Sequence, residues 1–146
     1  MKTRFPITAL ALSMMCGLLS EAQVRHEIQF PDLPEYQTLA CDFHMHTIFS
    51  DGTVWPSVRV DEAWRLGLDA IALTDHIEYQ PHEEDVNTQL NRPYDLAATL
   101  AREHGLLLPR AAEITRDTPP GHFNALFLND VEPLKVDGFL EAIERA

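Results

Sequence analysis

The sequence predicts an α/β fold that is built on a parallel sheet or a barrel. Short apolar runs that are typical of buried strands alternate with longer runs of helical period. Two of the helical runs close with a glycine, which is a common signal for the end of a helix. Strands that are joined by helices favour a parallel sheet or a barrel.

The first elements follow a polar lead. Residues 23–36 are polar and contain two prolines, and they predict an extended segment. Residues 37–46 place apolar side chains at alternating positions, which predicts the first strand. The turn signal at residues 51–52 then leads into a run of helical period over residues 57–67.

The remaining elements continue the alternation. Residues 68–76 form a short apolar run that ends in polar side chains, which is typical of a strand buried on both faces. A helix, two strands and a final helix are then predicted over residues 94–105, 106–115, 122–128 and 136–146. Pro109 removes one ladder donor from the third strand, so it indicates a sheet edge or a bulge there.

Composition is that of a single globular domain with an acidic surface. The chain has 146 residues, of which 45% are hydrophobic and 8% aromatic. Its formal charge is −12, from 23 acidic and 11 basic side chains. This sign does not favour nucleic-acid binding, which depends on lysine and arginine contacts to phosphate. It is compatible with binding of cations, and equally with solubility alone.

Residues 1–22 have the pattern of a secretory signal peptide. Lys2 and Arg4 precede an apolar run, and Ser20 and Ala22 supply the small side chains for a cut after Ala22. We therefore predict an exported protein, periplasmic or extracellular, from whose fold these residues are excluded. The apolar run falls short of the ~20 residues that span a bilayer, so no stable membrane anchor is expected after cleavage. A retained anchor is the weaker alternative.

Cleavage after Ala22 leaves Cys41 as the one cysteine, so no disulfide within the chain is expected. Cys41 lies in the apolar first strand, where a small buried side chain is the simplest interpretation. An exported chain without disulfides must be stabilised by its core or by bound metal.

Two histidines lie one strand repeat apart at the end of the first strand. Alternate side chains of a strand point to the same side, so His44 and His46 face one way and Met45 the other. Two imidazoles in this arrangement can close on one metal ion. By itself, the His-x-His spacing is a moderate signal for such a site.

Polar side chains at the other strand ends strengthen this signal. His76 ends the second strand, Glu113 lies near the end of the third, His122 opens the fourth, and Asp51 lies in the first loop. Parallel strands present their carboxyl ends at one face, so these side chains are expected to converge there. Imidazole with carboxylate suits zinc, iron or manganese better than calcium. The alternative is that these residues only cap helices and form turns, as Asp51 before a glycine could.

Four segments together resemble a known family. HMHTIFSDG, ALTDH, AAEIT and GHFNALF, in this order over roughly residues 38–130, resemble the polymerase and histidinol phosphatase (PHP) family. The resemblance implies a metal-dependent phosphoesterase on a distorted (β/α)7 TIM-like barrel, of which this chain carries about the first four strands. Residues 37–146 are then the N-terminal part of a PHP-like domain.

The resemblance also implies a set of metal ligands for up to three divalent ions, which are zinc, manganese or iron. By it, His44 and His46 bind the first ion, Asp51 and His76 the second, and Glu113 bridges ions and shares the third with His122. The family has a further histidine and a terminal Asp-x-His, and no histidine follows His122 in this chain. A missing C-terminal half or an oligomer is therefore expected, and the chain alone is expected to be marginally stable and poorly active.

The implied reaction is hydrolysis of a small-molecule phosphate ester by a metal-activated water, with no protein nucleophile. Two other functions stay open, which are an amidohydrolase-type metal hydrolase and a non-catalytic metal-binding remnant. His82 and Arg92 are candidates for contacts with substrate, His82 because its loop follows the second strand and Arg92 because a guanidinium matches phosphate oxygens. A solvated loop and a surface or capping role are their plainer interpretations.

Overall fold

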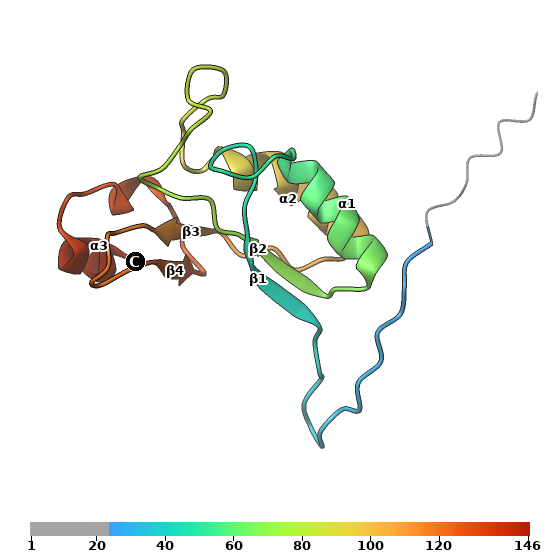
Figure 1. Ribbon diagram of the computed structural model, residues 1–146. Helices are drawn as coiled ribbons and strands as arrows, with labels where there is room; N and C mark the ends of the chain where they lie inside the picture. The colour runs from blue at the N-terminus through green and yellow to red at the C-terminus, as the bar shows by residue number, and fades with distance from the viewer. Residues whose placement is uncertain (1–23) are drawn as a thin grey trace, which may run out of the picture.

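The computed structural model describes residues 24–146, so the predicted signal peptide lies outside the described residues. The elements occur in the predicted order (Figure 1). They are β1 Cys41–Met45, α1 Pro56–Leu66, β2 Ala70–Leu73, α2 Arg92–His104, β3 Ala111–Ile114, β4 Phe123–Leu126, the 3-10 turn η1 Glu132–Leu134 and α3 Phe139–Arg145.

The first half of the chain is a parallel strand pair covered by two helices. β1 pairs with β2 in parallel, and all four residues of β2 are buried, as a run without polar alternation predicts. Figure 1 shows α1 and α2 lying together on one face of this pair. The core between them is formed by the buried side chains of Val60, Ala63, Ile71, Leu73, Ala97, Ala101 and Leu106.

Glycine ends both of these helices, as predicted. Gly67 after α1 has φ 86°, and Gly105 after α2 has φ 71°. This left-handed conformation lets the backbone N–H turn back to the last carbonyls of the helix, and only glycine adopts it without strain. α2 begins two residues earlier than predicted, because Pro93 fits the first turn of a helix, where no N–H is needed.

The second half is an antiparallel hairpin with its own core. β3 pairs with β4 so that Glu113 lies opposite Asn124. No helix intervenes between these strands, so β4 returns antiparallel to β3 instead of extending a parallel sheet. The core beneath the hairpin contains Ile77, Leu90, Ala112, Ile114, Ala125, Leu128, Val131, Leu134 and Ala142.

Two isolated parallel bridges join the halves, Ala70 with Leu107 and His76 with Glu113. Leu107 and Glu113 both lie in the predicted strand 106–115. Between them the strand is interrupted around Pro109, and it becomes regular only at β3. The missing N–H of a proline explains this gap. The result is a mixed α/β structure with two small sheets, and a partial TIM-like barrel remains a prediction.

The predicted burial of Cys41 is wrong. Cys41 is exposed at the start of β1, which pairs on one side only, with β2, within residues 24–146. An apolar alternation shows which side chains share a face, but it does not show how far along the strand that face is covered. Met45, on the same face as Cys41, packs against the helix-covered core, and Cys41 at the other end of β1 does not. The lead before β1 is mostly exposed, and the Arg25 guanidinium ties it to Asp69 at 2.9 Å. In this part of the chain, none of the helices combines the length and the apolar character needed to cross a membrane.

Candidate metal centre

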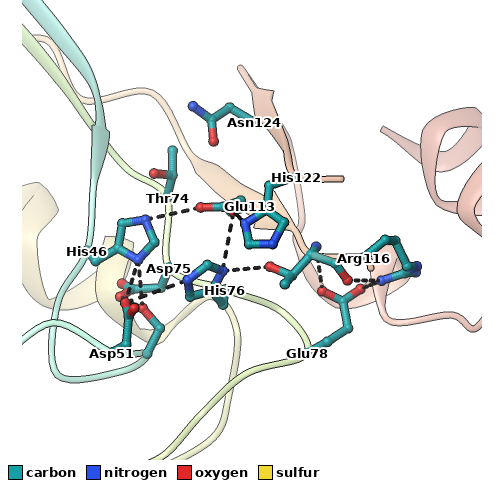
Figure 2. Close-up of polar contacts among 12 residues, drawn as sticks. His46, Asp51, Thr74, Asp75, His76, Glu78, Glu113, Arg116, His122 and Asn124 are labelled. Atoms are coloured by element: carbon teal, nitrogen blue, oxygen red, sulfur yellow. Dashed lines mark hydrogen bonds and ion pairs between the residues drawn. The ribbon is translucent and has the colours of Figure 1, made fainter. Parts of the chain in front are cut away.

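Six side chains converge where the ends of β1, β2 and β3 meet the beginning of β4 (Figure 2). They form three groups in which the nitrogen and carboxylate oxygen atoms all lie within 4.8 Å of one another. The groups are His44–His46–Glu113, His46–Asp51–His76 and His76–Glu113–His122. All six candidates of the sequence are thus brought together, although about 80 positions separate the first from the last. Their role as ligands remains a prediction.

The first group joins β1 to β3. The Nε2 atoms of His44 and His46 lie 3.0 Å apart, and their rings stack with centroids 5.0 Å apart. Both nitrogen atoms face Glu113 Oε2, at 3.4 Å from His44 and 3.1 Å from His46. The two histidines therefore point to the same side of β1, as their spacing predicts.

The second group joins the loop after β1 to the end of β2. His46 Nδ1 lies 2.7 Å from Asp51 Oδ1, and His76 Nε2 lies 3.6 Å from the same oxygen. Gly52 lets this loop fold tightly back, because a Cβ atom at that position would lie 2.6 Å from the carbonyl carbon of His46. This tight fold of the loop places Asp51 against His46.

The third group lies on the hairpin. Glu113 Oε1 is 3.4 Å from His76 Nδ1 and 2.5 Å from His122 Nδ1. His76 Nδ1 also lies 2.6 Å from the Thr115 hydroxyl. Glu113 and His76 are buried, whereas the side chains of His44 and His122 are 56% and 53% exposed. The centre is therefore closed below and open on the side of the outer histidines.

Glu113 is the residue that tests whether a cation fits. Its side chain is 1% exposed, and among the described residues neither of its oxygens accepts a hydrogen bond of good geometry. The nitrogen atoms of four histidines surround it instead. A buried carboxylate without donors is costly, and a cation held between it and the imidazoles removes that cost. The donor set fits a borderline divalent metal.

Two carboxyl groups at the centre have shifted pKa values in opposite directions. Burial raises the pKa of Asp51, but the hydrogen bond with His46 and the charges of His46 and His76 together bring it below its ordinary value. Burial raises the pKa of Asp75, and its hydrogen bonds with Ser50 and Thr47 only partly offset this. The surroundings of Asp51 thus favour its anionic form, whereas burial disfavours the anionic form of Asp75.

Several supporting residues were not assigned a role from the sequence. Asp75, Thr47 and Ser50 bond to one another below the centre, Thr115 contacts His76, and Asn124 contacts His44. Asn124 Nδ2 lies 2.9 Å from His44 Nδ1 and 3.3 Å from the carbonyl oxygen of Phe43. Asn124 lies two residues after His122, so the alternation of a strand could have placed it on the same face.

The two weaker candidates lie apart from the centre. Arg92 is exposed at the start of α2, and His82 is half-buried in the loop before it. Within residues 24–146, no hydrogen bond or ion pair connects either side chain to the six converging residues. Neither Arg92 nor His82 lines the two hollows that lie beside the centre. A groove of about 720 Å³ adjoins His44, His46 and Arg59, and a hollow of about 430 Å³ adjoins His122, Tyr79 and Arg116.

Comparison with solved structures shows which proteins this chain resembles. A crystal structure from Bacteroides vulgatus, of a two-domain protein containing a predicted PHP-like metal-dependent phosphoesterase, matches with a TM-score of 0.82 and 58% identity. The match covers 84% of this chain and 36% of that one. The resemblance to the PHP family is confirmed. This PHP-like chain therefore spans about a third of the length of the solved structure that it matches.

Two further similarities cover less of the chain. A proposed metal-dependent phosphoesterase from Bifidobacterium adolescentis matches with a TM-score of 0.46 and 31% identity, over 62% of this chain and 27% of that one. An uncharacterized protein of Methanocaldococcus jannaschii is 46% identical over 43 residues, which are 30% of this chain and 20% of that protein. No family model matches the chain.

Proposed function

We propose that this PHP-like chain carries the metal-binding part of a metal-dependent phosphoesterase that hydrolyses small-molecule phosphate esters. The observation that carries this proposal is Glu113, a buried carboxylate that faces four histidines and, among residues 24–146, has no hydrogen-bond donor of good geometry. The phosphoesterase description of the Bacteroides vulgatus protein supports the ester as the substrate class. That likeness favours a phosphate ester over the cyclic amide of an amidohydrolase.

The number of ions follows from the lone pairs of the histidines. A neutral imidazole has one lone pair, so it can bind one ion. The first and third groups share only Glu113, whose two oxygens face different histidines, so both groups can be filled at once. The second group uses His46 and His76, which the other two already use. We therefore propose two ions bridged by Glu113. Asp51 lies at the opposite nitrogen of His46, where it would accept the Nδ1–H and hold the ring with Nε2 toward the first ion.

With divalent ions bound, the centre would supply a water molecule of lowered pKa and positive charge to stabilise the phosphoryl oxygens. The residues of the chain position these components. His44 and His122 leave the open side of the centre to the substrate, while the buried Glu113 and His76 hold its base. The identity of the metal as zinc, manganese or iron is part of the proposal. Export of the protein is also part of the proposal, and its only support is the sequence pattern of residues 1–22.

Metal content and turnover measured on the same sample test this function. We expect about two equivalents of Zn²⁺ or Mn²⁺ per chain and hydrolysis of p-nitrophenyl phosphate that a chelator abolishes. Glu113→Gln is expected to lose both ions and all hydrolysis. Glu103→Gln, which makes the same change at an exposed position of α2, is expected to match the wild-type protein in both.

Stability of the metal-free protein gives a second measure of the same site. Without metal, Glu113→Gln is expected to raise the free energy of unfolding by about 1–3 kcal/mol, because it removes an unsatisfied buried charge. Bound metal that produces no hydrolysis would favour the non-catalytic alternative. A Glu113→Gln variant that keeps its metal, or a wild-type protein that binds none, would contradict the proposed centre.

A further inference from the structure

Asp75 is a buried carboxylate near the centre, and both of its oxygens accept hydrogen bonds. It is 9% exposed and lies two residues after the end of β2, next to His76. Its Oδ1 atom accepts hydrogen bonds from the Thr47 N–H and the Ser50 hydroxyl, both at 2.7 Å. Its Oδ2 atom accepts from the Thr47 hydroxyl at 2.8 Å. Three donors therefore occupy most of the acceptor sites of this carboxylate, and Asp75 belongs to none of the three groups of candidate ligands.

The donors of Asp75 belong to the turn that carries Asp51. Thr47 and Ser50 are both fully buried, and the Ser50 N–H donates to the Thr47 carbonyl oxygen at 3.1 Å. The turn begins directly after His46 and ends directly before Asp51, which lie 2.7 Å apart through Nδ1 and Oδ1. Figure 2 shows Asp75 between these two residues and His76. A displacement of the turn therefore separates His46 from Asp51.

The backbone of Asp75 fixes a further part of the centre. Its carbonyl oxygen accepts the Glu113 N–H at 3.0 Å, and the Ile77 N–H donates to the Glu113 carbonyl oxygen at 3.0 Å. His76 is its direct neighbour. Asp75 thus connects three segments that carry candidate ligands, which are the turn, the end of β2 and β3.

From these contacts we infer that Asp75 is a positioning residue, whose hydrogen bonds to Thr47 and Ser50 hold His46 and Asp51 in the geometry that binds metal. This inference rests on the proposed function for its metal-binding part. The contacts require an acceptor at Asp75 and do not require its charge. Asparagine can keep Oδ1 against the Thr47 N–H and Ser50 hydroxyl, while its NH2 group donates to the Thr47 hydroxyl, which can also act as an acceptor.

Asp75→Ala and Asp75→Asn separate these properties. In metal-free protein, we expect Asp75→Ala to lose hydrogen-exchange protection at the Thr47 and Ser50 amides, and Asp75→Asn to retain it. In titrations with Co²⁺, followed by its ligand-field absorption, Asp75→Ala is expected to bind about 10–100-fold more weakly, the range typical of lost supporting residues. Asp75→Asn is expected to bind nearly as tightly as the wild-type protein and to give the same absorption bands.

Asp69 provides the matched control at the opposite end of β2. Its carboxylate accepts hydrogen bonds from the Arg25 guanidinium and the Ala40 N–H, both at 2.9 Å. Asp69→Ala is expected to lower thermal stability without changing Co²⁺ affinity or the protection of the turn. Where Asp75→Ala does not fold, the double variant Thr47→Val with Ser50→Ala removes two of the three donors and is expected to weaken Co²⁺ binding in the same way.

Two results would overturn the inference. The first is wild-type protection and Co²⁺ affinity in Asp75→Ala or in the double variant. The second is an Asp75→Asn protein as impaired as Asp75→Ala, since that would show a requirement for charge. Failure of the proposed function has a different signature, because the wild-type protein would then bind no Co²⁺ while the exchange measurements still decide the role of Asp75.

Discussion

The His46–Asp51 pair and the His104–Asp61 pair have almost the same length and entirely different surroundings. The His46 Nδ1 to Asp51 Oδ1 distance is 2.7 Å, and the His104 Nε2 to Asp61 Oδ1 distance is 2.9 Å. His104 joins α2 to α1, and its ring stacks on Trp64 with the centroids 4.7 Å apart. That contact is a link between two packed helices.

His46 has a second nitrogen directed at another acid. Its Nε2 atom lies 3.1 Å from Glu113, a buried carboxylate that accepts no hydrogen bond within residues 24–146. The comparison shows that a histidine–aspartate distance does not identify a metal site. What distinguishes the two pairs is the uncompensated charge beside one of them, because only that charge makes cation binding favourable.

The largest expected difference between the two pairs appears when each histidine is replaced in turn. His46→Ala takes a ligand from the proposed centre, so its effect on Zn²⁺ affinity should exceed the roughly 10–100-fold loss typical of supporting residues. His104→Ala should leave Zn²⁺ affinity unchanged and cost about 1–2 kcal/mol of unfolding free energy, from the lost hydrogen bond and ring stacking. Isothermal titration calorimetry and denaturant unfolding with chelator measure the two quantities. Equal Zn²⁺ affinity in both variants would mean that His46 is no more a metal ligand than His104 is.

Much of the centre could be predicted because its residues follow from strand periodicity. His44 and His46 share a side of β1, and His76 and Glu113 lie at the ends of neighbouring parallel segments. These relations need only the order of elements and the direction of alternate side chains. The resemblance over four segments then gave the chemistry, which the match to the Bacteroides vulgatus protein supports.

What the sequence did not reveal depends on packing between distant segments. Cys41 was expected in the core, but it is exposed at the start of β1, whereas Met45 at the other end of the same face packs against the core. Pro109 indicated an irregular strand but not that the chain would divide into two small sheets. The role of Asp75 depends on a turn that folds back over the end of β2, and no local pattern specifies such a contact.

A smaller effect is expected from the residue that orients His44. To bind an ion through Nε2, neutral His44 must carry its proton on Nδ1, and that proton needs an acceptor. Asn124 can turn its amide oxygen toward Nδ1, since its amide nitrogen now lies 2.9 Å away. Asn124→Leu should therefore weaken Zn²⁺ binding by about tenfold, at the low end for supporting residues, because His44 is half-exposed.

Asn124→Asp is the matched variant for this orienting contact. Its carboxylate keeps the shape of the amide and offers only acceptors, so Zn²⁺ affinity should equal or exceed that of the wild-type protein. Calorimetric titration of both variants decides the matter. Equal weakening in the leucine and aspartate variants would indicate that Asn124 acts only through its bond to the Phe43 carbonyl oxygen, which both variants lose.

The smallest expected effect is that of Asp51 on the stability of the protein at low pH. Burial raises the pKa of Asp51, but the hydrogen bond and charge of His46 outweigh it, so the folded pKa lies below the ordinary 3.8. A carboxyl whose pKa is lowered by folding stabilises the protein above the unfolded pKa and loses this contribution as pH falls through the folded one. Asp51→Asn should therefore show a shallower fall in melting temperature between about pH 5 and about pH 3 in metal-free protein. Asp51 is 45% exposed, so the difference should be modest, and parallel melting curves would mean that the His46 contact does not hold in solution.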